Sequence, residues 1–456
     1  MSSNSNLMTE GSIYKQIIKF SFPIFCGNLF QQLYNTVDSL IIGNFVGKES
    51  LAAISSTGSL IFLLVGLFTG IFSGAGVVIS KYFGAGDEKN IQDSIHTAVA
   101  FGLISGIFMT IVGTLLAPQI LKLMGTPTPV FDKAVIYVRV YFAGILTVVM
   151  YNTANGIFQA MGNSKSPLYY LIISSIINVI LDLLFVVVFK MGIGGAAIAT
   201  VIAQGVSVSL AFYNLTHTTD IHRVNFKKIK IHKSLLKEIL SMGIPSGIQN
   251  SVIALANIVV QSNINAFGAT AVAGCGSYSK IEGFVFIPVT SFAMSMTTFI
   301  GQNLGAKKYK RAKKGTYFGI ATSTIMAESI GVVFYIFAPA LISLFSKDAQ
   351  VIEYGTAQAR TIAPFFFLLA FSHCIAGILR GAGKSTVPMI VMLACWCIIR
   401  VSYITIATKI VPEIYVIFWA YPLTWTLSSI IFLIYYLKSN WLHGLEKTPL
   451  IKTADM

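Results

Sequence analysis

The sequence predicts an all-α integral membrane protein with twelve transmembrane helices, arranged as two six-helix bundles that repeat each other. Three observations lead to this prediction. Only 11% of the 456 residues are charged and 55% are hydrophobic, whereas soluble domains carry roughly 25% charged residues. Apolar segments long enough to cross about 30 Å of hydrocarbon follow one another along the chain. Finally, motifs of the first half recur in the second half.

The predicted helices follow a polar N-terminal segment, residues 1–15, which does not resemble a cleavable signal peptide. Small residues in the second helix are expected to let a neighbour approach closely in lipid, namely the glycines at 66, 70, 74 and 76. Prolines within the helices are expected to produce kinks at positions 23, 245, 288 and 364. The twelve segments lie at 16–43, 51–83, 92–117, 130–160, 168–190, 193–216, 236–266, 272–303, 315–342, 351–379, 387–409 and 412–437.

The net charge of +15 raises the possibility of a nucleic-acid partner, but the distribution of charge argues against it. Lys and Arg gather in alternate loops between apolar segments, as the positive-inside rule predicts for cytoplasmic loops. Both termini are therefore expected in the cytoplasm of a bacterial cell, with the protein in the plasma membrane. The expected domains are a cytoplasmic N-terminus (1–15), an N-lobe (16–216), a basic linker (217–235), a C-lobe (236–437) and a cytoplasmic tail (438–456), whose positive charges include Lys447 and Lys452.

An internal repeat relates the two halves at an offset of 221 residues. Gly156, Gly162 and Pro167 in the first half correspond to Gly377, Gly383 and Pro388 in the second. Near the start of each half the offset is 222 residues, and Pro23 and Asn28 correspond to Pro245 and Asn250. An even number of helices per half gives both halves the same orientation, so we expect parallel repeats that rock around a central cavity.

Ionisable groups inside the apolar segments are the first functional candidates, because each costs about 2.5–3.5 kcal/mol at mid-helix. Asp38 lies in the first helix, Asn178 and Asp182 share one face of the fifth, and Thr200 lies in the sixth. At about 1.5 Å per residue, these helices carry all four groups to the outer half of the bilayer. Oxygen ligands of this kind suit a small cation such as Na⁺. Without a cation, two close carboxylates cannot both stay charged cheaply, so at least one is expected to bind a proton.

The second half does not repeat this cluster, since Val260, Ile399 and Tyr403 stand at the equivalent positions. A dedicated coupling site in one half is the favoured interpretation, and a buried polar network that only fixes helix packing is the alternative. Two further pairs of ionisable residues are possible partners in the second half: Lys280 with Glu282, and Glu328 with Arg400.

Several motifs together resemble the multidrug and toxic compound extrusion (MATE) family over nearly the whole chain. They are the paired six-helix halves, Leu33-Tyr-Asn-Thr-Val-Asp38, Gly84-Ala-Gly, the glycine-containing turns at 156–162 and 377–383, and Gly195-Ala-Ala-Ile-Ala-Thr200. The resemblance implies a V-shaped antiporter that expels amphipathic, often cationic, drugs while H⁺ or Na⁺ enters. It is nearest to the DinF-like branch, in which positions matching Asp38, Asn178, Asp182 and Thr200 form the cation site of the N-lobe.

The same resemblance implies that Gln31, Tyr34, Tyr137 and Asn155 line the drug cavity of the N-lobe, with Asn152 and Glu282 as secondary candidates. The NorM-like branch carries a Glu within the seventh helix, but here Glu238 lies only at the cytoplasmic start of that helix. No cofactor is expected beyond the coupling ion. The expected partners are small amphipathic or cationic molecules and membrane lipids, with no nucleic acid and a monomeric working state. A lipid-linked oligosaccharide flippase of related fold is the alternative function, and a membrane-embedded enzyme is a more distant one.

Overall fold

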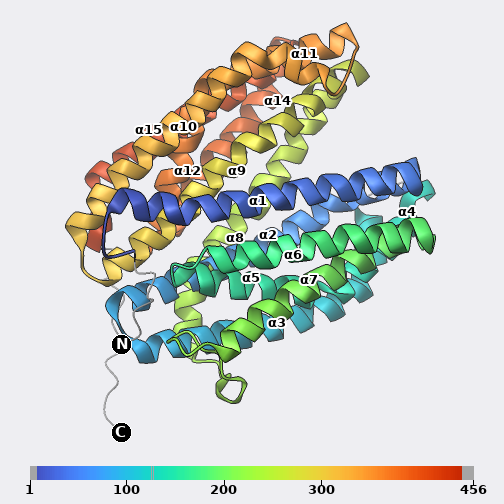
Figure 1. Ribbon diagram of the computed structural model, residues 1–456. Helices are drawn as coiled ribbons and strands as arrows, with labels where there is room; N and C mark the ends of the chain where they lie inside the picture. Colours follow the sequence, from blue (N-terminus) through green and yellow to red (C-terminus); the bar gives the residue numbers. More distant parts are fainter. Residues whose placement is uncertain (1–7, 125, 127, 444–456) are drawn as a thin grey trace. The chain divides into compact units, whose positions relative to one another are not determined.

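The computed structural model describes residues 8–124, 126 and 128–443, and it contains helices and no strand within those ranges (Figure 1). The helices of the first half are α1 (Ile13–Phe45), α2 (Lys48–Ala85), α3 (Glu88–Leu123), α4 (Thr128–Ala143), α5 (Ile145–Ala160), α6 (Lys165–Asp182), the π-helix η1 (Leu183–Val188) and α7 (Gly192–His217). The tail beyond residue 443, with Lys447 and Lys452, and the first seven residues lie outside the described ranges.

The second half begins after the short 3₁₀ turn η2 (Phe226–Lys228). Its helices are α8 (Lys233–Asn265), α9 (Ala269–Gly305), α10 (Tyr309–Ser343), α11 (Ala349–Ile362), the 3₁₀ turn η3 (Ala363–Phe365), α12 (Phe366–Gly381), α13 (Thr386–Met392), the π-helix η4 (Leu393–Ile399), α14 (Arg400–Ile410), α15 (Tyr415–Lys438) and the 3₁₀ turn η5 (Trp441–His443). When α4 with α5, α6 with η1, α11 through α12, and α13 through α14 are each taken as one helix, every predicted segment has its counterpart.

Among the described residues, ten helices are long and apolar enough to cross a membrane, and the bent pair α4 and α5 adds an eleventh. The remaining helix, α1, is 33 residues long but is less apolar, because Gln31, Gln32, Asn35 and Asp38 interrupt its hydrophobic sequence. The polar residues that make α1 a poor lipid-facing helix therefore include the predicted functional acid.

The fourth helix of each half is interrupted at an equivalent place. Between α4 and α5 the chain bends by 48° at Gly144. In the second half, η3 interrupts the helix where Pro364 removes a backbone donor. Pro23, Pro245 and Pro288, by contrast, lie inside uninterrupted helices. The internal repeat thus extends to the irregularities of the helices.

The chain forms two compact units. Unit 1 contains Phe22–Gly247, and unit 2 contains Met8–Ser21 together with Ile248 and the described residues that follow it. The helices α1 and α8 each contribute to both units, and each changes unit close to one of the repeated prolines, Pro23 or Pro245.

Unit 1 brings α2 and the first part of α8 into close contact. A Cβ atom on Gly70 or Gly74 would overlap the backbone of Gly247 or Gly243 on α8, so these positions require glycine. For Gly70 and Gly74 this confirms the prediction that small residues of the second helix allow a neighbouring helix to approach closely. Near the end of α2 and the start of α8, Lys81 Nζ lies 2.7 Å from Glu238 Oε1. The Tyr82 hydroxyl donates to Glu238 Oε2 at 3.0 Å.

The linker between the two halves packs against α3 of unit 1. The backbone N–H of Asn225 donates to His96 Nε2 at 3.1 Å, and that of His232 donates to Thr97 Oγ1 at 3.2 Å. The side chains of Val224 and Leu235 are almost fully buried. The basic segment is therefore anchored at several points along its length.

In unit 2 the segment before α1 packs on the turn between α9 and α10, as the linker packs on α3 in unit 1. The N–H of Met8 donates to Gln302 Oε1 at 2.8 Å, and its carbonyl accepts from Asn303 Nδ2 at 3.3 Å and Arg311 Nη2 at 3.1 Å. Arg311 Nη1 also donates to the Gly11 carbonyl at 2.7 Å. The described residues that precede α1 are thereby attached to unit 2.

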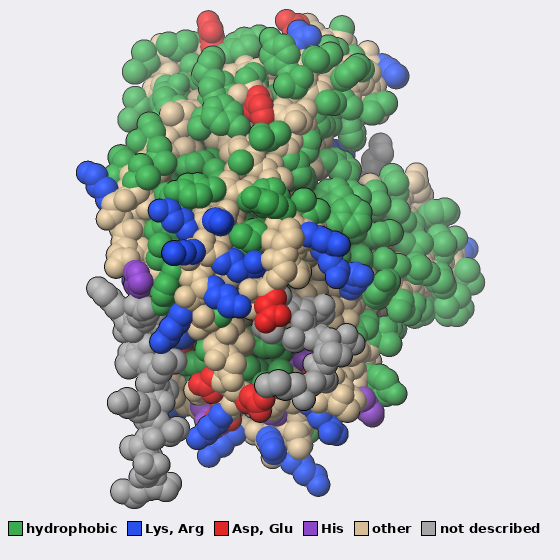
Figure 2. Space-filling model, turned by 60° about the vertical axis from the view of Figure 1, so that its left-hand side comes forward, with side chains coloured by type: hydrophobic (Ala, Val, Ile, Leu, Met, Phe, Trp, Pro, Cys, Tyr) green, Lys and Arg blue, Asp and Glu red, His purple; other side chains and the backbone are tan. Residues whose placement is uncertain are grey.

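The exposed surface of the helices is extensively hydrophobic, which suits contact with lipid (Figure 2). Lys and Arg side chains are concentrated in a separate region of the face that Figure 2 shows. This separation is the expected pattern for a protein whose spans face hydrocarbon and whose loops face water.

Candidate functional site

The central feature of unit 1 is a pair of carboxyl groups from two helices. Asp38 lies on α1 and Asp182 is the last residue of α6, and the two side chains are close enough to interact directly. Asp182 is fully buried, whereas Asp38 is partly exposed. The structure therefore brings together the two acids that the sequence singled out, although they are separated by more than a hundred residues.

Asn178 lies one helical turn before Asp182, with 2% of its surface exposed. Buried oxygens of both carboxyl groups, and both amide atoms of Asn178, have no hydrogen-bond partner among the described residues. Buried polar groups in this state are unfavourable, and they are suited to receive a proton or a small cation. Among the described residues, the polar groups of this cluster do not satisfy one another's hydrogen bonds completely.

A π-helical segment begins directly after Asp182. Within η1 the hydrogen bonds span one more residue than in an α-helix, which changes the direction of the following side chains. Such segments are frequent at functional sites. Here the change falls between the acid and the end of the π-helical segment at Val188.

Tyrosine and glutamine side chains surround the acids. Tyr34 lies one turn before Asp38, and its hydroxyl interacts with the side chains of Gln31 and Gln204. It also lies within electrostatic reach of both acids. Tyr137 of α4 is also within electrostatic reach of Asp38, Asp182 and Tyr34. Three of the four predicted cavity residues, Gln31, Tyr34 and Tyr137, thus lie around the carboxyl pair.

The remaining predicted residues are engaged elsewhere in unit 1. The Thr200 hydroxyl donates to the carbonyl of Ala196 in its own helix at 3.1 Å. Asn155 accepts from Gln159 Nε2 at 2.9 Å, and Asn152 donates to the carbonyl of Val148 at 2.8 Å. These contacts do not join the three side chains to the acids, so their functional roles remain predictions.

Sequence reasoning missed three neighbours of this site. Gln204 lies one turn beyond Thr200 on α7. Tyr141 lies one turn beyond Tyr137, and the rings of these two tyrosines are stacked with their centroids 6.4 Å apart. Tyr151 of α5 lies within electrostatic reach of Tyr34. A search for polar residues one helical turn from each candidate would have found Gln204 and Tyr141.

A conventional metal centre is not present in the parts of the chain that the structure describes, since no three His, Cys, Asp or Glu side chains gather there. The two carboxyl groups and the Asn178 amide form a smaller set of oxygen ligands. Such a set fits a transported H⁺ or Na⁺ better than a tightly held transition metal.

Unit 2 does not form the two pairs that the sequence suggested. Glu282 of α9 accepts from the Tyr278 hydroxyl at 3.0 Å, whereas Lys280 lies over the ring of Phe345. Glu328 accepts from the backbone N–H of Phe367 at 3.2 Å. Arg400 instead contacts Thr424, so the structure does not form the possible pair of Glu328 with Arg400.

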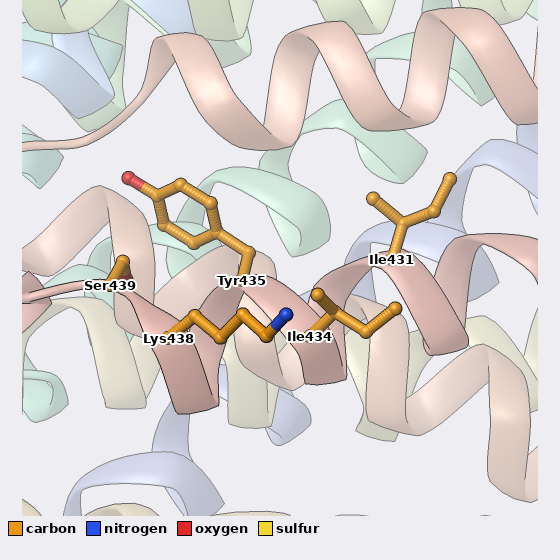
Figure 3. Close-up of a pocket in the computed structure, with 5 residues that line it drawn as sticks. All are labelled: Ile431, Ile434, Tyr435, Lys438 and Ser439. Atoms are coloured by element: carbon orange, nitrogen blue, oxygen red, sulfur yellow. The ribbon is translucent and has the colours of Figure 1, made fainter.

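A surface pocket at the end of α15 is distinct from these clusters (Figure 3). It is lined by Ile431, Ile434, Tyr435, Lys438 and Ser439, and it includes none of the predicted site residues. A lysine whose apolar stem lies along isoleucines at a helix end is typical of the boundary between hydrocarbon and water. The acids of unit 1 are therefore the candidate functional site that this pocket does not include.

Comparison with known proteins agrees with this architecture. The family model MatE matches residues 23–184 and 245–406, one match in each half. The chain is 27% identical over 396 residues to "Probable multidrug resistance protein YpnP" of Bacillus subtilis, covering 87% of this chain and 88% of the relative. It is 23% identical to "Multidrug export protein MepA" of Staphylococcus aureus, covering 82% and 83% of the two chains.

Solved structures show the same fold at lower sequence identity. An outward-facing multidrug resistance MATE family transporter superposes with a TM-score of 0.89 at 22% identity, covering the whole of both chains. A transporter from Pyrococcus furiosus, described as having a binding pocket of reverse polarity, gives a TM-score of 0.89 over 98% of each chain. Because the family model matches most of the sequence in two repeated blocks, the chain belongs to the multidrug and toxic compound extrusion family of membrane transporters.

Proposed function

We propose that the protein is a secondary active exporter that moves amphipathic, often cationic, compounds out of the cell in exchange for H⁺ or Na⁺. Members of its family are transporters, so the chain is a transporter and not an enzyme. Relatives named for multidrug resistance or multidrug export support the substrate class. The observation that carries the proposal is the pair of fully buried Asp182 and partly exposed Asp38, with Tyr34 and Tyr137 nearby.

In this mechanism the two carboxyl groups alternate between drug and coupling ion. Charged carboxylates attract a cationic compound into the tyrosine-lined region, where aromatic faces favour cations. Binding of H⁺ or Na⁺ at Asp38 and Asp182 neutralises that charge and lowers the affinity for the drug. Drug is then released outside, and the neutralised site allows the carrier to return by alternating access.

The neighbouring residues receive supporting roles under the same proposal. Asn178 supplies an amide oxygen to the ion, and Thr200 supplies a hydroxyl after it exchanges its bond to Ala196. Gln31, Tyr34 and Tyr137 contact the drug. Asn155 and Asn152 would contact the drug after giving up their hydrogen bonds with Gln159 and Val148. Glu282, the other secondary candidate, lies in unit 2 and is not part of this site. This assignment corresponds to the DinF-like branch of the family.

The proposal extends to placement in the cell. We place both termini and the linker in the cytoplasm of a bacterium, with lobes at 16–216 and 236–437 in the plasma membrane. The distribution of Lys and Arg supports this orientation. We also propose a monomer as the working state.

Purified protein in liposomes tests the mechanism. A pH gradient or a Na⁺ gradient is imposed separately, and efflux of ethidium is followed for wild type, Asp38→Asn, Asp182→Asn and the control Asp132→Asn. Asp132 is an exposed acid on α4 of the same unit. We expect gradient-driven efflux that both site variants lose and the control retains.

Full activity in both site variants would overturn the coupling role of the acids. Absence of efflux for every cation under either gradient would contradict drug export and favour a lipid-linked oligosaccharide as the next substrate. The gradient that supports efflux identifies the coupling ion.

A further inference from the structure

Unit 2 holds a second charged cluster that the proposed cation exchange does not use. Its centre is Arg400, the residue directly after the π-helix η4, with only 3% of its surface exposed. Its guanidinium lies over the ring of Tyr421 at 4.4 Å and near that of Trp396 at 5.5 Å. A permanent cation is thus held between two aromatic rings inside a helix that spans the membrane.

The hydrogen bonds of Arg400 are incomplete. Its Nε and Nη2 atoms donate to Thr424 Oγ1 at 3.1 and 2.9 Å, and that hydroxyl donates onward to the carbonyl of Ala420. Three hydrogen bonds fill the capacity of one hydroxyl. A guanidinium has five N–H donors, yet the described residues provide it with neither a second acceptor nor a bonded carboxylate. Several donors of a buried cation are therefore available to a ligand.

Glu282 is the nearby carboxylate of this cluster, and it does not pair with Arg400. It attracts Arg400 electrostatically, but its hydrogen bond comes from the Tyr278 hydroxyl. Glu282 and Tyr421 are only partly buried, so they form the edge where the cluster reaches the surface of unit 2. The cluster thus combines a buried cation with two partly exposed neighbours.

We propose that Arg400, framed by Trp396 and Tyr421, recognises the anionic group of an amphipathic substrate, such as a carboxylate or a phosphate. The planar guanidinium matches both groups through paired hydrogen bonds. The two rings offer faces for the apolar part of the same molecule. Glu282 acts as the internal counter-charge when the site is empty and competes with the incoming anion.

This inference rests on the proposed export of amphipathic compounds, and it broadens their class from cations to molecules that also carry an anionic group. The position next to a π-helix is an independent observation in its favour, because such segments are frequent at functional sites. The site would lie in unit 2, whereas the coupling acids lie in unit 1.

Two matched pairs of fluorescent probes test the proposal by equilibrium binding to the purified full-length protein. Tetramethylrhodamine and its methyl ester differ in a free carboxylate, and flavin mononucleotide and riboflavin differ in a phosphate. We expect Arg400→Gln to raise the Kd of the anionic member of at least one pair by about tenfold, as a lost charge-assisted interaction predicts. The Kd of the counterpart that lacks the anionic group should change by less than about twofold.

Glu282→Gln provides the opposite test, since removal of the competing carboxylate should tighten binding of the same anionic probe. Arg360→Gln is the matched control, because Arg360 is an exposed arginine of unit 2 that also contacts a tyrosine ring. Arg400→Lys keeps the charge and should retain part of the affinity, which separates recognition from misfolding.

A response of the carboxylate pair alone, or of the phosphate pair alone, would identify the group that the site prefers. Equal losses for both members of each pair in Arg400→Gln would assign Arg400 a structural role and overturn the proposal, as would wild-type protein that binds neither anionic probe. Failure of the methyl ester alone to bind wild type would count against export of cationic drugs and would leave the anionic comparison intact.

Discussion

The fifth helix of each half contains a π-helical segment, but the charged residue beside it has opposite sign in the two units. In unit 1, Asp182 directly precedes η1 and meets Asp38 of α1. In unit 2, Arg400 directly follows η4, and Val260 stands where the repeat would place a second acid. The repeated fold therefore preserves a place for irregular, polar structure in the fifth helix, while the chemistry there has diverged.

The largest expected effect tests whether this difference in charge separates two functions. Asp182→Asn should reduce ion-driven efflux of ethidium by about a hundredfold, because an amide cannot exchange a proton or balance Na⁺ with a full charge. Arg400→Gln should leave ethidium efflux within about twofold of wild type, because the probe has no anionic group. Transport rates in liposomes measure both.

If the two substitutions abolish ethidium efflux equally, the units do not have separate roles and the comparison fails. Asp182→Glu serves as the control for charge, since it retains the carboxylate at a shifted position and should keep part of the activity.

The next largest effect concerns the contacts by which each unit holds the segment that it takes from the other half of the chain. Unit 1 uses the buried ion pair of Lys81 and Glu238, whose side chains are 5% and 8% exposed. Unit 2 uses neutral Gln302 and Asn303 at the equivalent positions of the repeat. Glu238→Gln should lower the free energy of unfolding by about 3–5 kcal/mol, because Lys81 stays buried without its counter-charge.

Gln302→Ala should lower the free energy of unfolding by only about 1 kcal/mol, as expected for one neutral hydrogen bond. Thermal unfolding in detergent measures both variants. The double variant Lys81→Met, Glu238→Leu should recover much of the lost stability, since apolar pairs often replace buried ion pairs without loss. Equal effects of Glu238→Gln and Gln302→Ala would show that charge does not distinguish the two attachments.

A smaller effect is expected from the glycines that pack helices in unit 1. A Cβ atom on Gly247 would lie 2.5 Å from the carbonyl oxygen of Leu67, so Gly247→Ala must push α2 and α8 apart. Overpacking of this kind typically costs about 1–3 kcal/mol. Gly276 of α9 in unit 2 has no atom within 4 Å of the place that an alanine methyl group would take, and Gly276→Ala should stabilise the helix by up to about 1 kcal/mol.

Thermal unfolding of the two variants in the same detergent gives the comparison. A loss of stability in Gly276→Ala as large as that in Gly247→Ala would show that the close approach of α2 and α8 is not what requires glycine.

The sequence was sufficient to predict the helices, their repeat and the meeting of Asp38 with Asp182, because length, hydropathy and the cost of a buried acid are local or pairwise properties. It was not sufficient for Arg400. Its partners Thr424 and Tyr421 lie on α15, and only the packing of α15 against η4 and α14 selects them over Glu328. The π-helices were also missed, since one extra residue in a helical turn leaves no clear mark in an apolar sequence.

The smallest expected effect concerns the linker that only unit 1 carries. His222 is buried against Phe158, with ring centroids 6.2 Å apart, and this burial lowers the pKa of His222 despite the opposing charge of Asp220. The unfolded linker therefore binds a proton more readily than the folded one, so its stability should fall as the pH drops below about 6.5, the ordinary value for histidine. Hydrogen exchange of residues 218–232, corrected for the intrinsic effect of pH, should accelerate on acidification in wild type and less in His222→Phe, which keeps the ring contact. The turn between α9 and α10 in unit 2 contains no histidine and serves as the control, since its exchange should not accelerate on acidification. Acceleration in both segments would show a general destabilisation by acid and would contradict the role of His222.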